Sequence, residues 1–185
     1  MEYEGHSCQS PEEREKLVRD KIAKEDEMEA QATGDSRLII EELLRRLGYR
    51  DGEIESDIPF EVSTGAHSGT CSTDFIVKIG GRRFMGIKCT MALESRERHI
   101  VSFCRVADRM VIPVAVVTDG LTAIVVDTMT GRPLSEGLDS IPDRERALSL
   151  LEGAPEQPFP EGDKAEKTRR VLLAFETTGC PRPRN

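Results

Sequence analysis

The stretch that decides the fold is Thr73-Asp74-Phe75-Ile76-Val77-Lys78-Ile79-Gly80-Gly81-Arg82-Arg83-Phe84-Met85-Gly86-Ile87-Lys88-Cys89. It contains two strand-like apolar runs separated by Gly80-Gly81, a pair that can take positive φ at both positions of a two-residue hairpin turn. Residues near the open ends of a tight hairpin lie opposite each other. The stretch therefore predicts a β-hairpin in which Asp74 and Lys88 converge although they are far apart in sequence.

Length and composition limit the possible fold classes. The chain has 185 residues, of which 37% are hydrophobic and 32% charged, and it contains no Trp. This is enough chain for one domain with extensions, built around an aliphatic core. The longest apolar run, 110–117, is too short to span a bilayer, and the N-terminus lacks a basic-then-apolar signal pattern. We expect a cytoplasmic protein without a membrane partner.

Charge and cysteine usage exclude several function classes. A net charge of −8 argues against a general polyanion-binding surface, so any contact with nucleic acid must be local. The five cysteines are scattered, with no CxxC pair. We therefore expect free thiols rather than a zinc site or a disulfide framework.

The N-terminal third predicts two helices. Ser10 followed by Pro11 and acidic residues is typical of a helix start, and the helix should run to about residue 32. Its thin apolar stripe favours a solvated helix docked by one end over a coiled-coil arm. Residues 33–36 predict a break and a new cap. A core helix over 36–47 should follow, with its apolar face formed by Leu38, Ile40, Leu43, Leu44 and Leu47.

The rest of the chain alternates strands and helices. An edge strand is expected at 57–62, a loop at 63–72, the hairpin at 73–89, an amphipathic helix at 93–109, and buried strands at 112–118 and 121–127. Short helices are expected at 143–152 and 163–175, on either side of a proline-rich linker. We expect a helical extension at 1–35, a core at 36–152, and a linker with a C-terminal helix at 153–185.

Four segments in this order carry a resemblance: Leu43-Leu44-Arg45-Arg46-Leu47-Gly48-Tyr49, Thr73-Asp74-Phe75-Ile76-Val77, Gly86-Ile87-Lys88, and Val116-Val117-Thr118-Asp119-Gly120. Together they resemble the N-terminal domain of type I restriction enzyme R subunits, which belongs to the PD-(D/E)xK restriction-endonuclease-like superfamily. The resemblance covers roughly residues 36 to 130. It implies an α/β fold with a mixed sheet of about five strands flanked by helices, here with extra N- and C-terminal helices.

The resemblance also implies a nuclease site that is incomplete here. Asp74 would bind Mg²⁺, and Lys88 would orient the attacking water or stabilise developing negative charge. The family places a second acidic ligand two positions before the lysine, where this chain has Gly86. Its downstream helix carries a Gln and an aromatic residue, where this chain has His99 and Phe103.

Other residues could complete or extend such a site. A migrated acid could replace the lost ligand, with Glu42 and Glu61 as the candidates, and Glu41 stands beside Glu42 on the same expected helix. Arg82 and Arg83 at the hairpin tip form a small basic spot that could contact phosphate.

Each residue also has an ordinary structural interpretation. Asp74 could cap a turn, and Lys88 could be an exposed charge that discourages strand pairing. Glu41 and Glu42 could be solvated helix positions, and His99 an ordinary histidine. Gly86 could mark a close backbone approach instead of a ligand position.

Three functions therefore remain open. The missing carboxylate and the acidic charge balance favour a silent nuclease fold that binds nucleic acid or a protein partner, including a second copy of the chain. The alternative is a Mg²⁺-dependent endonuclease that cleaves DNA phosphodiesters with a migrated ligand. The third is a regulatory α/β domain without a nucleic-acid role.

Overall fold

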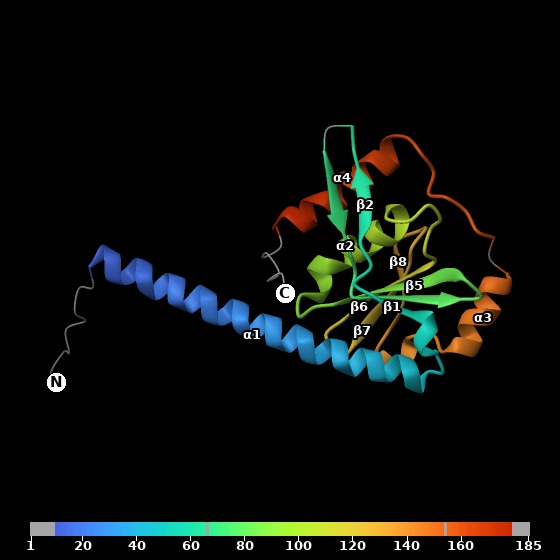
Figure 1. The fold of residues 1–185 in the computed structure, drawn as a ribbon, viewed down its shortest axis with the longest axis horizontal. Coiled ribbons are helices and arrows are strands. Elements are labelled where there is room, and N and C mark those ends of the chain that lie inside the picture. Colours follow the sequence, from blue (N-terminus) through green and yellow to red (C-terminus); the bar gives the residue numbers. More distant parts are fainter. Residues whose placement is uncertain (1–9, 66, 154, 179–185) are drawn as a thin grey trace.

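The computed structural model describes residues 10–65, 67–153 and 155–178, and it is an α/β protein built on one mixed sheet (Figure 1). The sheet has the order β1-β4-β5-β6-β7-β8, and a separate two-stranded sheet pairs β2 with β3. The helices are α1 (Pro11–Arg46), α2 (Leu93–Val106), α3 (Arg144–Glu152) and α4 (Asp163–Thr178). The strands are β1 (Ile54–Ser56), β2 (Phe60–Ser63), β3 (Ser68–Cys71), β4 (Phe75–Ile79), β5 (Arg82–Cys89), β6 (Val114–Thr118), β7 (Ala123–Asp127) and β8 (Arg132–Glu136).

The hairpin of β4 and β5 occupies the second and third places in the sheet, and its prediction is confirmed. Gly80 and Gly81 form its turn with φ of 58° and 85°, which only glycine adopts without strain. All neighbouring strands are antiparallel except β5 and β6, which run parallel and are joined by the crossover helix α2. The register pairs Phe75 with Ile87, so the residues just outside β4 meet the end of β5.

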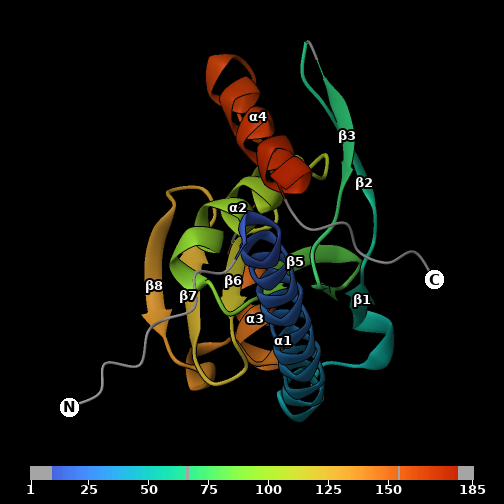
Figure 2. The same ribbon diagram turned by 90° about the vertical axis from the view of Figure 1, so that its left-hand side faces the viewer.

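Two hydrophobic clusters cover the two faces of the sheet. One face packs against Ile40 and Leu44 of α1 and against α3. The other packs against Ile100, Phe103 and Cys104 of α2 and against α4. Because side chains of a strand alternate between faces, the nearly continuous apolar sequence of β6 fits burial on both sides. Figure 2 shows α4 lying beyond α2 on its side of the sheet.

Helix α1 begins where the sequence predicts but does not break. Ser10 caps it, accepting a hydrogen bond from Glu13 N at 3.2 Å and donating its own N–H to the Glu13 carboxylate at 2.8 Å. The predicted break at 33–36 is wrong, because one helix runs through Gly34 to Arg46. Gly34 costs the helix only about 1 kcal/mol relative to Ala, too little to end it alone.

Ser36 anchors α1 to the sheet instead of starting a new helix. Its hydroxyl oxygen lies 2.8 Å from Ala32 O and also contacts Asp119 O in the turn between β6 and β7. Gly120 allows this approach, because a Cβ there would lie 3.1 Å from the Ser36 Cα. The boundary expected between an extension and the core at 35/36 thus falls inside a continuous helix.

The N-terminal part of α1 extends away from the rest of the protein (Figure 1). Residues 11–31 are exposed, including Leu17 and Ile22. This agrees with the predicted solvated helix docked by one end. Of the apolar face predicted further along, Ile40 and Leu44 are buried, but Leu38 is 68% exposed and its predicted core position is wrong.

Three strand predictions need correction. The strand expected at 57–62 begins only at Phe60, as β2, and pairs with β3 in the segment expected to be a loop. The preceding segment, which was expected to be a connection, contains β1, and β1 joins the main sheet. Asp57 separates the two strands with a positive φ of 53°. The sheet also gains a sixth strand, β8, where the sequence indicated only a closing turn.

The helices expected after the hairpin are confirmed as α2, α3 and α4, with α2 shorter than expected at its C-terminus. Helix α4 packs against α2 through the buried Leu172. Within the described part of the chain, no helix is both long and apolar enough to cross a membrane.

Candidate functional site

The site is centred on Asp74, which immediately precedes β4. Its backbone N–H donates to Ile87 O at 3.1 Å, and the hydroxyl of the neighbouring Thr73 donates to the same carbonyl at 2.6 Å. These bonds extend the hairpin ladder by one position beyond β4 and fix the Asp74 backbone opposite the end of β5. The Asp74 side chain is buried, at 1% exposure.

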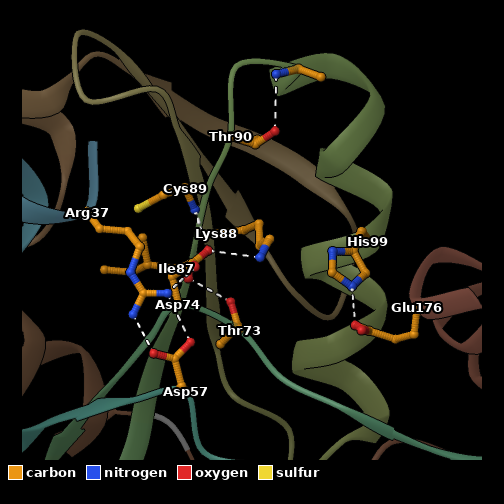
Figure 3. A network of polar contacts seen from close by, with 11 residues as sticks. Arg37, Asp57, Thr73, Asp74, Ile87, Lys88, Cys89, Thr90, His99 and Glu176 are labelled. Atoms are coloured by element: carbon orange, nitrogen blue, oxygen red, sulfur yellow. Dashed lines mark hydrogen bonds and ion pairs between the residues drawn. The ribbon is translucent and has the colours of Figure 1, made fainter. Parts of the chain in front are cut away.

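Two cations and one backbone N–H contact the Asp74 carboxylate (Figure 3). Arg37 Nη1 donates to Oδ1 at 2.7 Å. Lys88 Nζ lies 3.0 Å from Oδ2, and Cys89 N donates to the same oxygen at 2.8 Å. The predicted convergence of Asp74 and Lys88 is therefore observed. The Asp74 carboxylate, which was expected to bind a metal ion, instead forms ion pairs with Arg37 and Lys88.

Arg37 is the site residue that the sequence interpretation missed. Its guanidinium bridges Asp74 and Asp57, and it lies over the Phe75 ring with 5.4 Å from Cζ to the ring centroid. The hydrogen bonds that Arg37 donates to Asp57 raise the pKa of Arg37 above its usual range, against the lowering effect of burial. One signal was present, since Arg37 precedes the buried Ile40 by three residues and so lies on the core-facing side of the helix.

Asp57 completes the connection between α1 and the sheet. It follows β1, and its backbone N–H donates to Asp74 O at 3.3 Å. Its carboxylate accepts hydrogen bonds from both terminal nitrogens of Arg37. Arg37, Asp57 and Asp74 thus tie α1 to the β1–β2 connection and to the start of β4.

Gly86, the position that the resemblance would give to a second acid, has no room for a side chain. A Cβ placed on Gly86 would lie 2.6 Å from Cys104 Sγ and 3.6 Å from Ile100 Cδ1, both on α2. The interpretation of Gly86 as a point of close approach is therefore correct, although the approaching group is a side chain rather than a backbone. Cys104 is completely buried, and burial raises the pKa of its thiol to about 12.

The acids considered as migrated ligands lie in other surroundings. Glu42 is on the exposed side of α1, and the neighbouring Glu41 forms an ion pair with Arg45. Glu61 is exposed on β2 and accepts a hydrogen bond from Thr70 at 2.6 Å. In residues 10–65, 67–153 and 155–178, no three or more His, Cys, Asp or Glu side chains gather in a way that could hold a metal ion.

The basic spot at the hairpin tip is neutralised by acids of the protein itself. Arg82 Nε lies 3.1 Å from Glu156 Oε1. Arg83 bridges Glu55 at 3.2 Å and Asp108 at 2.6 Å. These two arginines line a cavity of about 240 Å³, but their ion pairs leave little positive charge for a phosphate.

His99 and Phe103, which the resemblance would match to a Gln and an aromatic residue, both pack between elements. His99 Nε2 lies 3.0 Å from Glu176 Oε1 of α4, and Phe103 meets Phe60 edge-on with 5.3 Å between ring centroids. The acidic partner of His99 was not identified from sequence because the two residues lie on different helices. Figure 3 shows this pair on the α2 side of the Asp74 network.

The cysteine prediction is confirmed where the structure describes it. Cys71, Cys89 and Cys104 are free and buried. Burial raises the pKa of Cys89 to about 12, and the negative charge of Asp74 acts in the same direction. Cys8 and Cys180 lie outside the described residues.

Comparison with protein-family models, with curated proteins and with solved structures finds no match to this chain. Its function is therefore argued from the geometry of the Asp74 site and from the rest of the structure.

Proposed function

We propose that this protein is a non-catalytic member of the restriction-endonuclease-like fold, resembling the N-terminal domain of type I restriction R subunits, and that it binds a nucleic acid or a protein partner without cleaving it. The order of helix α1, strands β1, β4 and β5, crossover helix α2 and strand β6 supports the fold assignment. The proposal that the protein does not cleave nucleic acid rests on the ion pairs of Asp74.

The Asp74 carboxylate already has the partners that a metal ion would replace. Mg²⁺ takes oxygen ligands in near-octahedral geometry, usually with one or two protein carboxylates. Here Arg37, Lys88 and the Cys89 N–H direct three donors at the two carboxylate oxygens. A cation entering this site would meet two positive side chains, and the second acid at the site, Asp57, is itself bound to Arg37. The residues present fit a buried ion-pair network better than a Mg²⁺ site.

The same network has a clear structural role. Removal of one partner from a buried ion pair typically costs about 3–5 kcal/mol, because the remaining charge is left uncompensated. Asp74 is 1% exposed, so loss of its charge would leave the guanidinium of Arg37 and the ammonium of Lys88 without their shared partner. Asp74 therefore holds the hairpin to α1 through Arg37, and Lys88 pairs with Asp74 from within the hairpin. These structural roles need no catalysis.

The competing candidate is a Mg²⁺-dependent endonuclease. The observation in its favour is the 3.0 Å approach of Lys88 to Asp74, because a nuclease of this family would also bring its acid and its lysine together. In that case the Arg37 ion pair would have to open when metal and nucleic acid bind.

The test combines metal binding with cleavage. Calorimetry with MgCl₂ and MnCl₂, and cleavage assays on plasmid and single-stranded DNA, should give neither binding heat nor products for the unmodified chain. Asp74→Asn keeps the side-chain shape and should lower stability by several kcal/mol, judged from the typical cost of breaking a buried pair. Glu61→Gln removes an exposed acid and serves as the matched control, with stability expected to stay within about 0.5 kcal/mol.

Metal-dependent cleavage that disappears in both Lys88→Gln and Asp74→Asn, with Glu61→Gln still active, would overturn the proposal. Lys88→Gln is informative even if Asp74→Asn does not fold, because Lys88 is partly exposed and its loss leaves Arg37 paired with Asp74.

A further inference from the structure

A second, larger hollow lies between α2, α4 and the turn that joins β7 to β8. Its volume is about 530 Å³, within the range of ordinary ligand sites. It lies at the opposite end of the sheet from Asp74. Thr128 in this turn hydrogen-bonds to Pro113 just before β6, whereas Lys88 pairs with Val117 near the end of β6. We call this hollow the α2–α4 groove.

Four basic residues line the α2–α4 groove: Arg98 and Arg105 of α2, and Lys164 and Lys167 of α4. Glu97 is the one acidic residue among the described residues that line it. No carboxylate of the described part of the chain forms an ion pair with any of the four cations. This contrasts with Arg37, Arg82 and Arg83, which all have acidic partners.

Arg105 is held in place at the floor of the groove. Its Nε donates to Thr128 O at 2.7 Å and its Nη2 to Met129 O at 3.2 Å. Gly131 leaves room for it, because a Cβ at that position would lie 3.0 Å from Arg105 Nη2. The guanidinium also lies 5.3 Å from the centroid of the Phe159 ring. Backbone carbonyls and a ring therefore fix a cation that has no ion-paired carboxylate.

Burial lowers the pKa of the Arg105 guanidinium, and the negative charge of Asp127 partly offsets this. Placing such a group beside Arg98, Lys164 and Lys167 is electrostatically unfavourable in the isolated protein. An anion in the groove would relieve this repulsion. In a chain of net charge −8, this cluster of cations without ion-paired carboxylates is a local feature.

The spacing of the cations fits a row of phosphates. Arg98 and Arg105 are seven residues apart on α2, which is a distance of about 10 Å along a helix that rises about 1.5 Å per residue. Lys164 and Lys167 lie three residues apart on one face of α4. Phosphates along one strand of stacked nucleic acid follow one another at about 3.4 Å of axial rise, so a span of about 10 Å corresponds to about three steps from phosphate to phosphate.

We propose that the α2–α4 groove binds the phosphate backbone of a nucleic-acid strand through Arg98, Arg105, Lys164 and Lys167. The proposal rests on the proposed function and names the partner class of the binding module. No aromatic side chain is among the described residues lining the groove, so it offers no surface on which a base could stack. Recognition through phosphates alone favours a strand over a free nucleotide and is independent of base sequence.

The experiment measures binding of a fluorescein-labelled single-stranded DNA of about 20 nucleotides, longer than the site sizes of about 4–16 nucleotides common for such grooves. Fluorescence anisotropy should detect binding at low salt. With three phosphates neutralised, affinity should fall about 20-fold between about 50 and 200 mM salt. The double variant Lys164→Glu/Lys167→Glu should weaken binding at least about 10-fold at the lower salt concentration.

A matched control reverses the charge of two lysines outside the groove. Lys21 and Lys24 are also two lysines three residues apart on an exposed helical surface, and Lys21→Glu/Lys24→Glu changes the net charge equally. This control should change affinity less than about twofold, because its charges lie outside the groove. Arg98→Gln provides an independent variant on the other helix and should also weaken binding.

Three results would overturn the proposal: no binding by the unmodified chain at low salt, equal losses in the two double variants, or displacement of the DNA by micromolar ATP. The last would assign the groove to a small phosphate compound. DNA binding with equal losses in both double variants would leave the proposed function standing and refute the groove. Groove-dependent binding together with Mg²⁺-dependent cleavage would refute the proposed function and support the groove.

Discussion

Gly86 gives the sharpest test of the close approach between β5 and α2. In Gly86→Ala, the new Cβ would lie 2.6 Å from Cys104 Sγ, about 0.8 Å inside the 3.4 Å at which ordinary van der Waals contact begins. Cys104 is fully buried on α2 and has little room to move. Overpacking of this kind costs about 1–3 kcal/mol. Replacing a strand glycine returns about 0.5–1 kcal/mol, so the expected net loss is about 1–2 kcal/mol.

The same contact predicts rescue by a second change. Cys104→Ala removes the sulfur that the new methyl group meets and should by itself cost about 1–2 kcal/mol through lost packing. In Gly86→Ala/Cys104→Ala the methyl group occupies the vacated space, so the double variant should be more stable than the sum of the single effects by about 1–2 kcal/mol.

Urea unfolding followed by circular dichroism measures this coupling, and each kcal/mol should also appear as about 2–4 °C in Tm for a chain of this size. Gly86→Ala/Cys89→Ala is the matched control. Cys89 is a buried thiol of the same strand that faces the other cluster, so its effect should add to that of Gly86→Ala. Additive effects for the Cys104 pair, within about 0.5 kcal/mol, would refute the close approach and reopen position 86 to an acidic ligand.

Three further predictions address other parts of the structure. Gly34→Ala should raise the helical circular dichroism signal and should not destabilise the protein, because Gly34 lies inside α1 with open space around it; a loss of stability would indicate the broken helix. Hydrogen bonding by Arg144 lowers the pKa of Glu53, so this pair contributes stability above the usual glutamate pKa, and that contribution is lost as pH falls through the lowered value. The free energy of unfolding of Glu53→Gln should therefore depend less on pH between about 3 and 5 than that of the unmodified chain, and parallel curves would contradict this. Cys89 and Cys104, whose pKa values burial raises to about 12, should resist alkylation at pH 8 in the folded protein and react only after denaturation, as site-resolved mass spectrometry would show.

The sequence predicted that the first part of α1 is a solvent-exposed helix, but it did not predict that the same helix continues to Arg46. Its apolar stripe is too thin for a core helix, and the structure leaves it exposed. Isolated helices gain little stability in water, so a helix-weakening residue such as Gly34 leads to the prediction of a break when only the sequence is considered. The contact of Ser36 with the β6–β7 turn holds the next part of the helix to the sheet. This contact could not be predicted from the sequence near Ser36, because its partner lies far along the chain.

The sequence by itself determined the central hairpin and the meeting of Asp74 with Lys88. A glycine turn, two apolar strands and the pairing rule of antiparallel strands suffice for this, because all of the residues involved lie within one short segment. Only the tertiary structure decided what that meeting means. Arg37 comes to Asp74 from α1, and Cys104 comes to Gly86 from α2. Such contacts depend on how whole helices pack across the sheet, and the periodicity that reveals a helix does not specify which side chain of another element will face it.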